Sequence, residues 1–145
     1  MSRLNESSIF ITLKQLRKTL YTSMFYMDKG NRIVYGTPIM QRLGDVISEF
    51  IIAFTVTEDK WRHLDLAIGY FGVVRCDLEF CMEANMFHFP KRKAVEKDKN
   101  GNVIDERDTV NARKIEILQY VAKIDNEMCK WRASITKGKS VYDNK

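Results

Sequence analysis

Apolar side chains recur at steps of three and four along four long segments of this chain. The segments cover Ser8–Asp28, Thr37–Thr57, Glu58–Phe87 and Thr109–Ile135. Such steps place side chains on one face of a helix, because an α-helix has about 3.6 residues per turn. The pattern therefore predicts an all-α protein, built as an up-and-down antiparallel four-helix bundle.

Short polar residues mark the expected helix starts. Ser7 or Ser8 can cap the first helix, because a short side-chain oxygen accepts a hydrogen bond from a free backbone N–H. Thr37 is the expected cap of the second helix, since Pro38 is tolerated in a first turn and costly further in. Thr57 is the expected cap of the third helix.

Residues 89–108 interrupt the apolar pattern. Pro90 ends the third helix, and the pair Asn100-Gly101 between alternating residues is a strong hairpin signal. We therefore expect a β-ribbon or a mobile loop inserted between the third and fourth helices. Residues 1–145 are expected to form one domain, and the polar tail 138–145 is expected to be flexible.

Composition agrees with a water-soluble domain. Apolar residues make up 45% of the 145 positions and charged residues 30%, which is the balance of a globular protein. No apolar run approaches the roughly 18 residues that a membrane span requires, and no apolar leader precedes the first helix. The odd number of cysteines, three, favours buried free thiols in a reducing, cytoplasmic compartment.

Metal-binding motifs are not completed by the residues present. A calcium loop starting at Asp98 would need glycine at its sixth position and glutamate at its twelfth, where Val103 and Thr109 stand. A di-iron bundle needs Glu-x-x-His motifs, and neither His63 nor His88 has a glutamate three residues before it. We therefore expect no metal and no cofactor.

The remaining reactive side chains are interpreted as structural. Cys76 and Cys81 are five residues apart on one helix, so they diverge and are expected to be core residues. His63 is expected on a solvated helix face, and Glu49 can be a buried carboxylate paired with an arginine such as Arg75. No nucleophile, base and orienting carboxylate are spaced for catalysis, so we expect no enzyme.

The net charge of +5 and the pI near 9.1 are compatible with a polyanionic partner. Phosphate binding needs several cations on one surface, and the alternative is a mixed surface solvated by water. The candidate nucleic-acid-binding residues lie in three groups: Arg17 and Lys18 in the first segment; Lys91, Arg92 and Lys93 in the insertion; and Arg113, Lys130 and Arg132 in the last segment.

One stretch resembles the signature of a known family. Residues 29–36, Lys-Gly-Asn-Arg-Ile-Val-Tyr-Gly, are similar to the pattern Pro-Lys-x-x-Arg-x-x-Leu-Gly between the first two helices of a four-helix-bundle family. That family includes the ribosomal-RNA intervening-sequence proteins and the accessory variability protein of diversity-generating retroelements. Residues 64–67 and 74–78 resemble its third helix, and Ile124 followed by Trp131 resembles its fourth.

The resemblance implies a non-enzymatic bundle that assembles into a pentameric barrel. In the retroelement members this homo-oligomer binds a reverse transcriptase and nucleic acid, RNA or DNA. The resemblance adds Arg32 and Arg75 to the basic surface as the matching basic positions, and Lys29 is a further candidate. The chain departs from the family where Asp28 replaces proline and where Glu79, four residues after Arg75, replaces a basic residue. The alternative function is a protein-only interaction module that oligomerises without touching nucleic acid.

Overall fold

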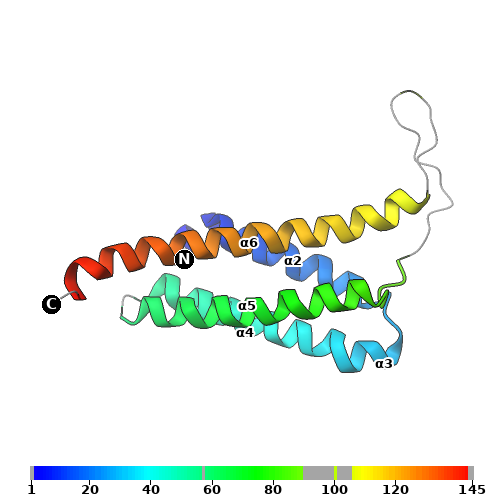
Figure 1. Ribbon diagram of the computed structural model, residues 1–145, viewed down its shortest axis with the longest axis horizontal. Coiled ribbons are helices and arrows are strands. Elements are labelled where there is room, and N and C mark those ends of the chain that lie inside the picture. Colours follow the sequence, from blue (N-terminus) through cyan, green and yellow to red (C-terminus); the bar gives the residue numbers. More distant parts are fainter. Residues whose placement is uncertain (1, 57, 90–99, 101–105, 144–145) are drawn as a thin grey trace.

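The computed structural model describes residues 2–56, 58–89, 100 and 106–143, and all of its regular elements are helices (Figure 1). They are α1 (Ser2–Glu6), α2 (Ser8–Met24), α3 (Lys29–Asn31), the π-helix η1 (Arg32–Gly36), α4 (Thr37–Thr55), α5 (Lys60–Glu83) and α6 (Glu106–Asp143). The described part of the chain is therefore all-α, as the apolar pattern predicts. The β-ribbon or loop expected over 89–108 lies almost entirely outside the described residues.

The four long helices are arranged side by side, and successive ones run in opposite directions (Figure 1). α4 packs along α5, and α2 packs along α6. α5 also contacts α6, whereas α2 and α4 approach each other over a shorter stretch. The helices thus enclose one core, and the α2–α4 side is the least closed.

The core contains the apolar stripes that define the predicted helices. Its fully buried side chains include Leu13, Leu16 and Leu20 of α2, Leu43, Val46 and Phe50 of α4, Phe71, Val74 and Leu78 of α5, and Ile117, Val121 and Ile124 of α6. At the start of the last predicted helix, where apolar residues at steps of three and four from Ile115 and Leu118 were expected to form the buried stripe, Ile115 and Leu118 are exposed and Ile117 is buried instead. No described helix has the length and apolar character needed to cross a membrane.

Helix α2 begins as predicted. The Ser7 hydroxyl accepts a hydrogen bond from the backbone N–H of Phe10 at 3.4 Å. Thr57, the expected cap of the third helix, lies outside the described residues, and α5 begins at Lys60 after Asp59, which has a left-handed φ of 55°.

The predicted start of the second helix is wrong. The backbone is helical from Lys29 onward, so Thr37 lies inside a continuous helical run instead of capping it. Its N–H bonds to the carbonyl of Arg32, five residues back, which is the bond of a π-helix. This wider turn ends just before Pro38, where the ring nitrogen has no hydrogen to give.

Helix α5 ends earlier than the apolar pattern predicts. Asn85 takes a left-handed φ of 54°, and the Met86 N–H bonds back to the Cys81 carbonyl at 2.9 Å. An asparagine in this conformation is a common helix stop. The His88 N–H then donates to the Tyr26 carbonyl at 2.7 Å and ties this end of the chain to the end of α2.

The last helix is longer than predicted, because α6 continues past Ile135 to Asp143. Its backbone is therefore helical through most of the tail that was expected to be flexible. No proline lies beyond Ile135, and a single glycine, Gly138, costs a helix only about 1 kcal/mol. The short helix α1 is also missing from the prediction, although its Leu4 is buried in the core.

We expect Leu78→Ala to lower the free energy of unfolding by about 2–5 kcal/mol, because Leu78 is fully buried and its removal leaves a cavity. Leu66→Ala in the same helix is the matched control, since Leu66 is 38% exposed, and it should cost less than about 1 kcal/mol. Urea unfolding followed by circular dichroism measures both values. Equal losses for the two variants would contradict the assigned core face of α5.

Candidate nucleic-acid interface

One solvent-facing side of α2 carries three basic side chains followed by two aromatic ones. Lys14, Arg17, Lys18, Tyr21 and Phe25 follow one another at steps of one, three or four, so they lie along one side of the helix. All five are exposed. The opposite side of α2 carries the buried leucines, and packing against α6 therefore leaves this side available.

The π-helix η1 brings a further cation to the same region. Arg32 is half-buried, and its Nη2 donates a hydrogen bond to the Met27 carbonyl at 3.2 Å. Its Nε is buried without a hydrogen-bond partner among the described residues. A guanidinium has five N–H donors, so Arg32 keeps unused donor capacity at this position.

Two adjoining depressions lie between α2 and the η1–α4 run. The first has a volume of about 430 Å³, and its lining residues are Arg17, Tyr21, Met24, Phe25, Arg32, Gly36, Thr37, Met40, Gln41 and Gly44. The second has about 490 Å³, and its lining residues are Lys14, Arg17, Lys18, Tyr21 and Met40. Because they share Arg17, Tyr21 and Met40, we treat them as one feature, the α2–α4 groove.

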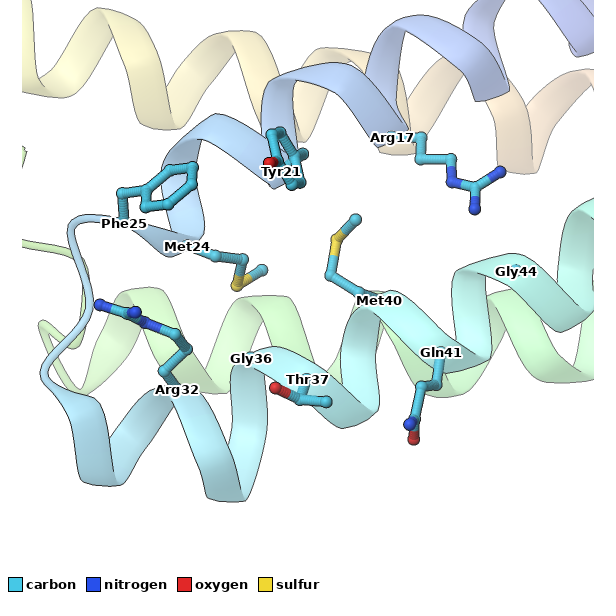
Figure 2. Close-up of a pocket in the computed structure, with 10 residues that line it drawn as sticks. All are labelled: Arg17, Tyr21, Met24, Phe25, Arg32, Gly36, Thr37, Met40, Gln41 and Gly44. Carbon is cyan, nitrogen blue, oxygen red and sulfur yellow. The ribbon is translucent and has the colours of Figure 1, made fainter.

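The groove is apolar between its charged ends. Figure 2 shows Met24 and Met40 facing the space between the two helices, with Arg17 reaching down from α2 toward α4. Arg32 extends from η1 toward the loop that follows α2 (Figure 2). No acidic side chain is among the described residues that line the groove. Such a surface can hold an anion that also has an apolar face.

Of the predicted basic residues, the structure brings Arg17, Lys18 and Arg32 together in the groove. Lys29 is exposed at the start of α3 but does not line the groove. Lys130 is exposed on α6. The three predicted residues of the insertion, Lys91, Arg92 and Lys93, lie outside the described residues.

The other three predicted arginines have protein partners. Arg75 pairs with Asp125 at 3.2 Å and approaches Glu79 at 3.9 Å. Arg132 binds both carboxylate oxygens of Asp65, with Nη2 at 3.1 Å from Oδ2, and lies over the Trp61 ring. These pairs neutralise both charges and link α5 to α6.

The third of these arginines stacks on a ring. Arg113 lies over the Phe89 ring, 5.5 Å from its centroid. This contact fixes the arginine at the start of α6 against the segment that follows α5.

Two interpretations of titratable residues are corrected. Glu49 pairs with His63, whose Nδ1 lies 2.7 Å from Oε2, and not with Arg75. His63 is therefore not on a freely solvated face: it is half-buried and joins α5 to α4. Among the described residues no three His, Cys, Asp or Glu side chains gather in the geometry of a metal site.

The cysteines differ from one another in exposure. Cys81 is buried as expected, whereas Cys76 and Cys129 are exposed free thiols. Burial is the main cause that raises the pKa of the Cys81 thiol to about 11, and the negative charge of Asp77 adds to the same effect. The prediction of a core position therefore holds for Cys81 and is wrong for Cys76, and the expectation of buried thiols is also wrong for Cys129.

Sequence reasoning missed the non-basic part of the groove. Tyr21 and Phe25 are 61% and 60% exposed, and their rings meet edge to face with centroids 5.4 Å apart. Their spacing from Lys14 and Lys18 was available in the sequence and would have marked a basic–aromatic face. The contribution of Met40 and Gly44 depends on how α4 lies across α2, which no local pattern reveals.

Comparison of the chain with family models, curated proteins and solved structures gives no match. The family resemblance thus rests on the short motifs quoted above.

We expect Cys76 and Cys129 to react with iodoacetamide at about pH 8 and Cys81 to remain unmodified in the folded protein. A pKa of about 11 instead of 9.0 lowers the thiolate fraction of Cys81 about a hundredfold, and burial blocks access. Mass spectrometry of peptides from labelled protein, with and without urea, measures this difference. Labelling of all three thiols at one rate without urea would contradict it.

The same shift gives a direction for stability. The unfolded thiol ionises near pH 9.0 and the folded one near pH 11, so deprotonation of Cys81 favours the unfolded state. The contribution of Cys81 to the free energy of unfolding is therefore intact below about pH 9 and is lost as the pH rises toward 11.

Proposed function

We propose that this protein is a non-enzymatic accessory protein that binds nucleic acid through the α2–α4 groove. The observation that supports the proposal is the convergence of Lys14, Arg17, Lys18 and Arg32 on one groove that has no acidic lining among the described residues. Clustered cations bind a phosphate backbone favourably, because binding releases the counterions that had condensed on the phosphates. Exposed rings beside them supply stacking surfaces for bases.

The proposal includes the architecture that the resemblance implies. We assign the four long helices to an up-and-down four-helix bundle, supported by their alternating directions and their pairwise packing (Figure 1). By the same resemblance, the protein partner is a reverse transcriptase and the assembly is a pentamer. Residues 29–36, which carry the resemblance, include Arg32 and Gly36 of the groove.

A second candidate function is the protein-only module that oligomerises. Ile33 and Val34 of η1 are each 61% exposed, and Phe25 nearby in the chain is 60% exposed. Exposed apolar side chains that gather on one surface often mark a protein–protein contact. This observation supports self-association in either candidate function.

We expect the double variant Arg17→Glu/Lys18→Glu to bind a mixed-sequence RNA at least tenfold more weakly than the unchanged protein at about 0.1 M salt. If the four cations of the groove contact phosphates of a single strand, a fourfold rise in salt concentration should weaken binding about fiftyfold. The affinity of the variant should depend less steeply on salt concentration. Fluorescence anisotropy of a labelled RNA measures both quantities.

The matched control is Arg62→Glu/Lys123→Glu, which makes the same charge change at exposed positions of α5 and α6 that do not line the groove. It should retain most of the affinity if the groove is the binding surface. Equal losses in both double variants would indicate general charge attraction, and no binding by the unchanged protein would favour the protein-only module.

We expect the protein to self-associate and the double variant Ile33→Glu/Val34→Glu to shift it toward the 17.0 kDa monomer, because two charges would have to be buried in the contact. Light scattering coupled to size exclusion measures the mass. A monomer mass for the unchanged protein at every concentration tested would contradict both the pentamer and the protein-only module.

A further inference from the structure

The part of the α2–α4 groove that reaches η1 has the size and lining of a small-molecule site. Its volume of about 430 Å³ lies within the range of about 300–1,000 Å³ that ligand pockets occupy. Met24 and Met40 provide an apolar lining, and methionine adapts its shape to flat ring systems. The exposed Tyr21–Phe25 ring pair stands at the rim.

Cations stand at both ends of this apolar lining. Arg17 extends from α2 toward the part of α4 that contains Gly44, and Arg32 lies at the other end, with its guanidinium directed toward the loop that follows α2 (Figure 2). Of the five N–H donors of Arg32, only one on Nη2 has a hydrogen-bond partner among the described residues, the Met27 carbonyl, which leaves further Nη donors for a phosphate. An occupant that fits this lining has an apolar, flat body with negative charge on two sides.

A nucleotide within a single strand has this chemistry, since each base is flanked by two phosphates. A fatty acid or a membrane lipid carries its charge at one end only, and the bases of a duplex are already stacked and paired. We propose that the α2–α4 groove accepts one unpaired base of a single-stranded nucleic acid between Met24, Met40 and Tyr21, with the flanking phosphates on Arg17 and Arg32. This inference rests on the proposed function and specifies the ligand of that site.

The glycine at position 44 offers a test that changes no charge. A Cβ atom at Gly44 would meet nothing within 4 Å, and Gly44 lines the cavity, so the side chain of Gly44→Leu has room to occupy it. Gly69→Leu is the matched control: Gly69 is exposed in α5, and a Cβ atom there also meets nothing within 4 Å. Both substitutions raise helix propensity, so both variants should fold.

The probes are three labelled DNA oligonucleotides of about 12 nucleotides: a single strand, its duplex, and a strand with abasic sugars at its centre. A single RNA strand of the same sequence is added to compare the two sugars. We expect the unchanged protein and Gly69→Leu to bind the single strand at least about tenfold more tightly than the duplex or the abasic strand. Gly44→Leu should bind all three DNA probes alike, at the affinity of the duplex.

The outcomes separate this inference from the proposed function. Equal binding of single strand, duplex and abasic strand by the unchanged protein would overturn base insertion and leave nucleic-acid binding standing. An equal loss of single-strand affinity in Gly44→Leu and Gly69→Leu would also overturn base insertion, because the loss would then not come from filling the cavity. Absence of binding to every probe would overturn both.

Discussion

The apolar side of α2 is buried mainly against α6, and α2 meets α4 over a shorter stretch. This division of contacts decides which surfaces of α2 reach solvent. A helix at the surface of a protein buries a stripe about 100° wide in the core, and in α2 this stripe contains the leucines at positions 13, 16 and 20. The flank of α2 that faces α4 is only partly covered, and the α2–α4 groove lies there.

The ion pairs of the protein sort its basic residues into two kinds. Arg75 and Arg132 each reach a carboxylate on a neighbouring helix, and their pairs connect α5 with α6. Exposed pairs of this kind contribute little stability, about 1 kcal/mol or less, but they cancel local charge. On the groove side no ion pair involves Arg17, Lys18 or Arg32 among the described residues. Among the described residues, the basic side chains that line the groove therefore keep their positive charge uncompensated by a nearby carboxylate.

The helices could be predicted from sequence because burial imposes a period on apolar residues, as the stripes of Leu13–Leu20 and Leu43–Phe50 show. Their limits were less predictable, since Thr37 and Asn85 act through backbone conformations that many sequences allow. Pairings between helices were not predictable at all. Glu49 pairs with His63 and not with an arginine because of how α4 and α5 are aligned along each other, and that alignment depends on the whole core.

The candidate site was also predictable only where its residues lie on a single helix. The cations of α2 could be identified from composition and spacing, because they lie on one helix. The contributions of Met40 and Gly44 required the crossing of α4 over α2. Arg32 was indicated by the family resemblance, but its place in the groove depends on how η1 lies against the end of α2. The lining of a cavity between two helices is not specified by either helix alone. Its apolar part could therefore not be predicted from the charged and catalytic groups of the sequence.

Gly36 belongs both to the packing of η1 against α2 and to the lining of the groove. A Cβ atom at this position would lie 2.8 Å from the Met24 sulfur, 3.1 Å from the Met27 sulfur and 3.4 Å from Cγ of Arg32. The absence of a side chain therefore lets the end of α2 approach η1 and leaves room for the stem of Arg32. In a regular α-helical turn, Thr37 N–H would bond to residue 33; the π turn instead extends this bond to Arg32. The close approach that joins α2 to η1 thus also places a cation with unused donors at the end of the groove, so structure and proposed binding depend on the same contact.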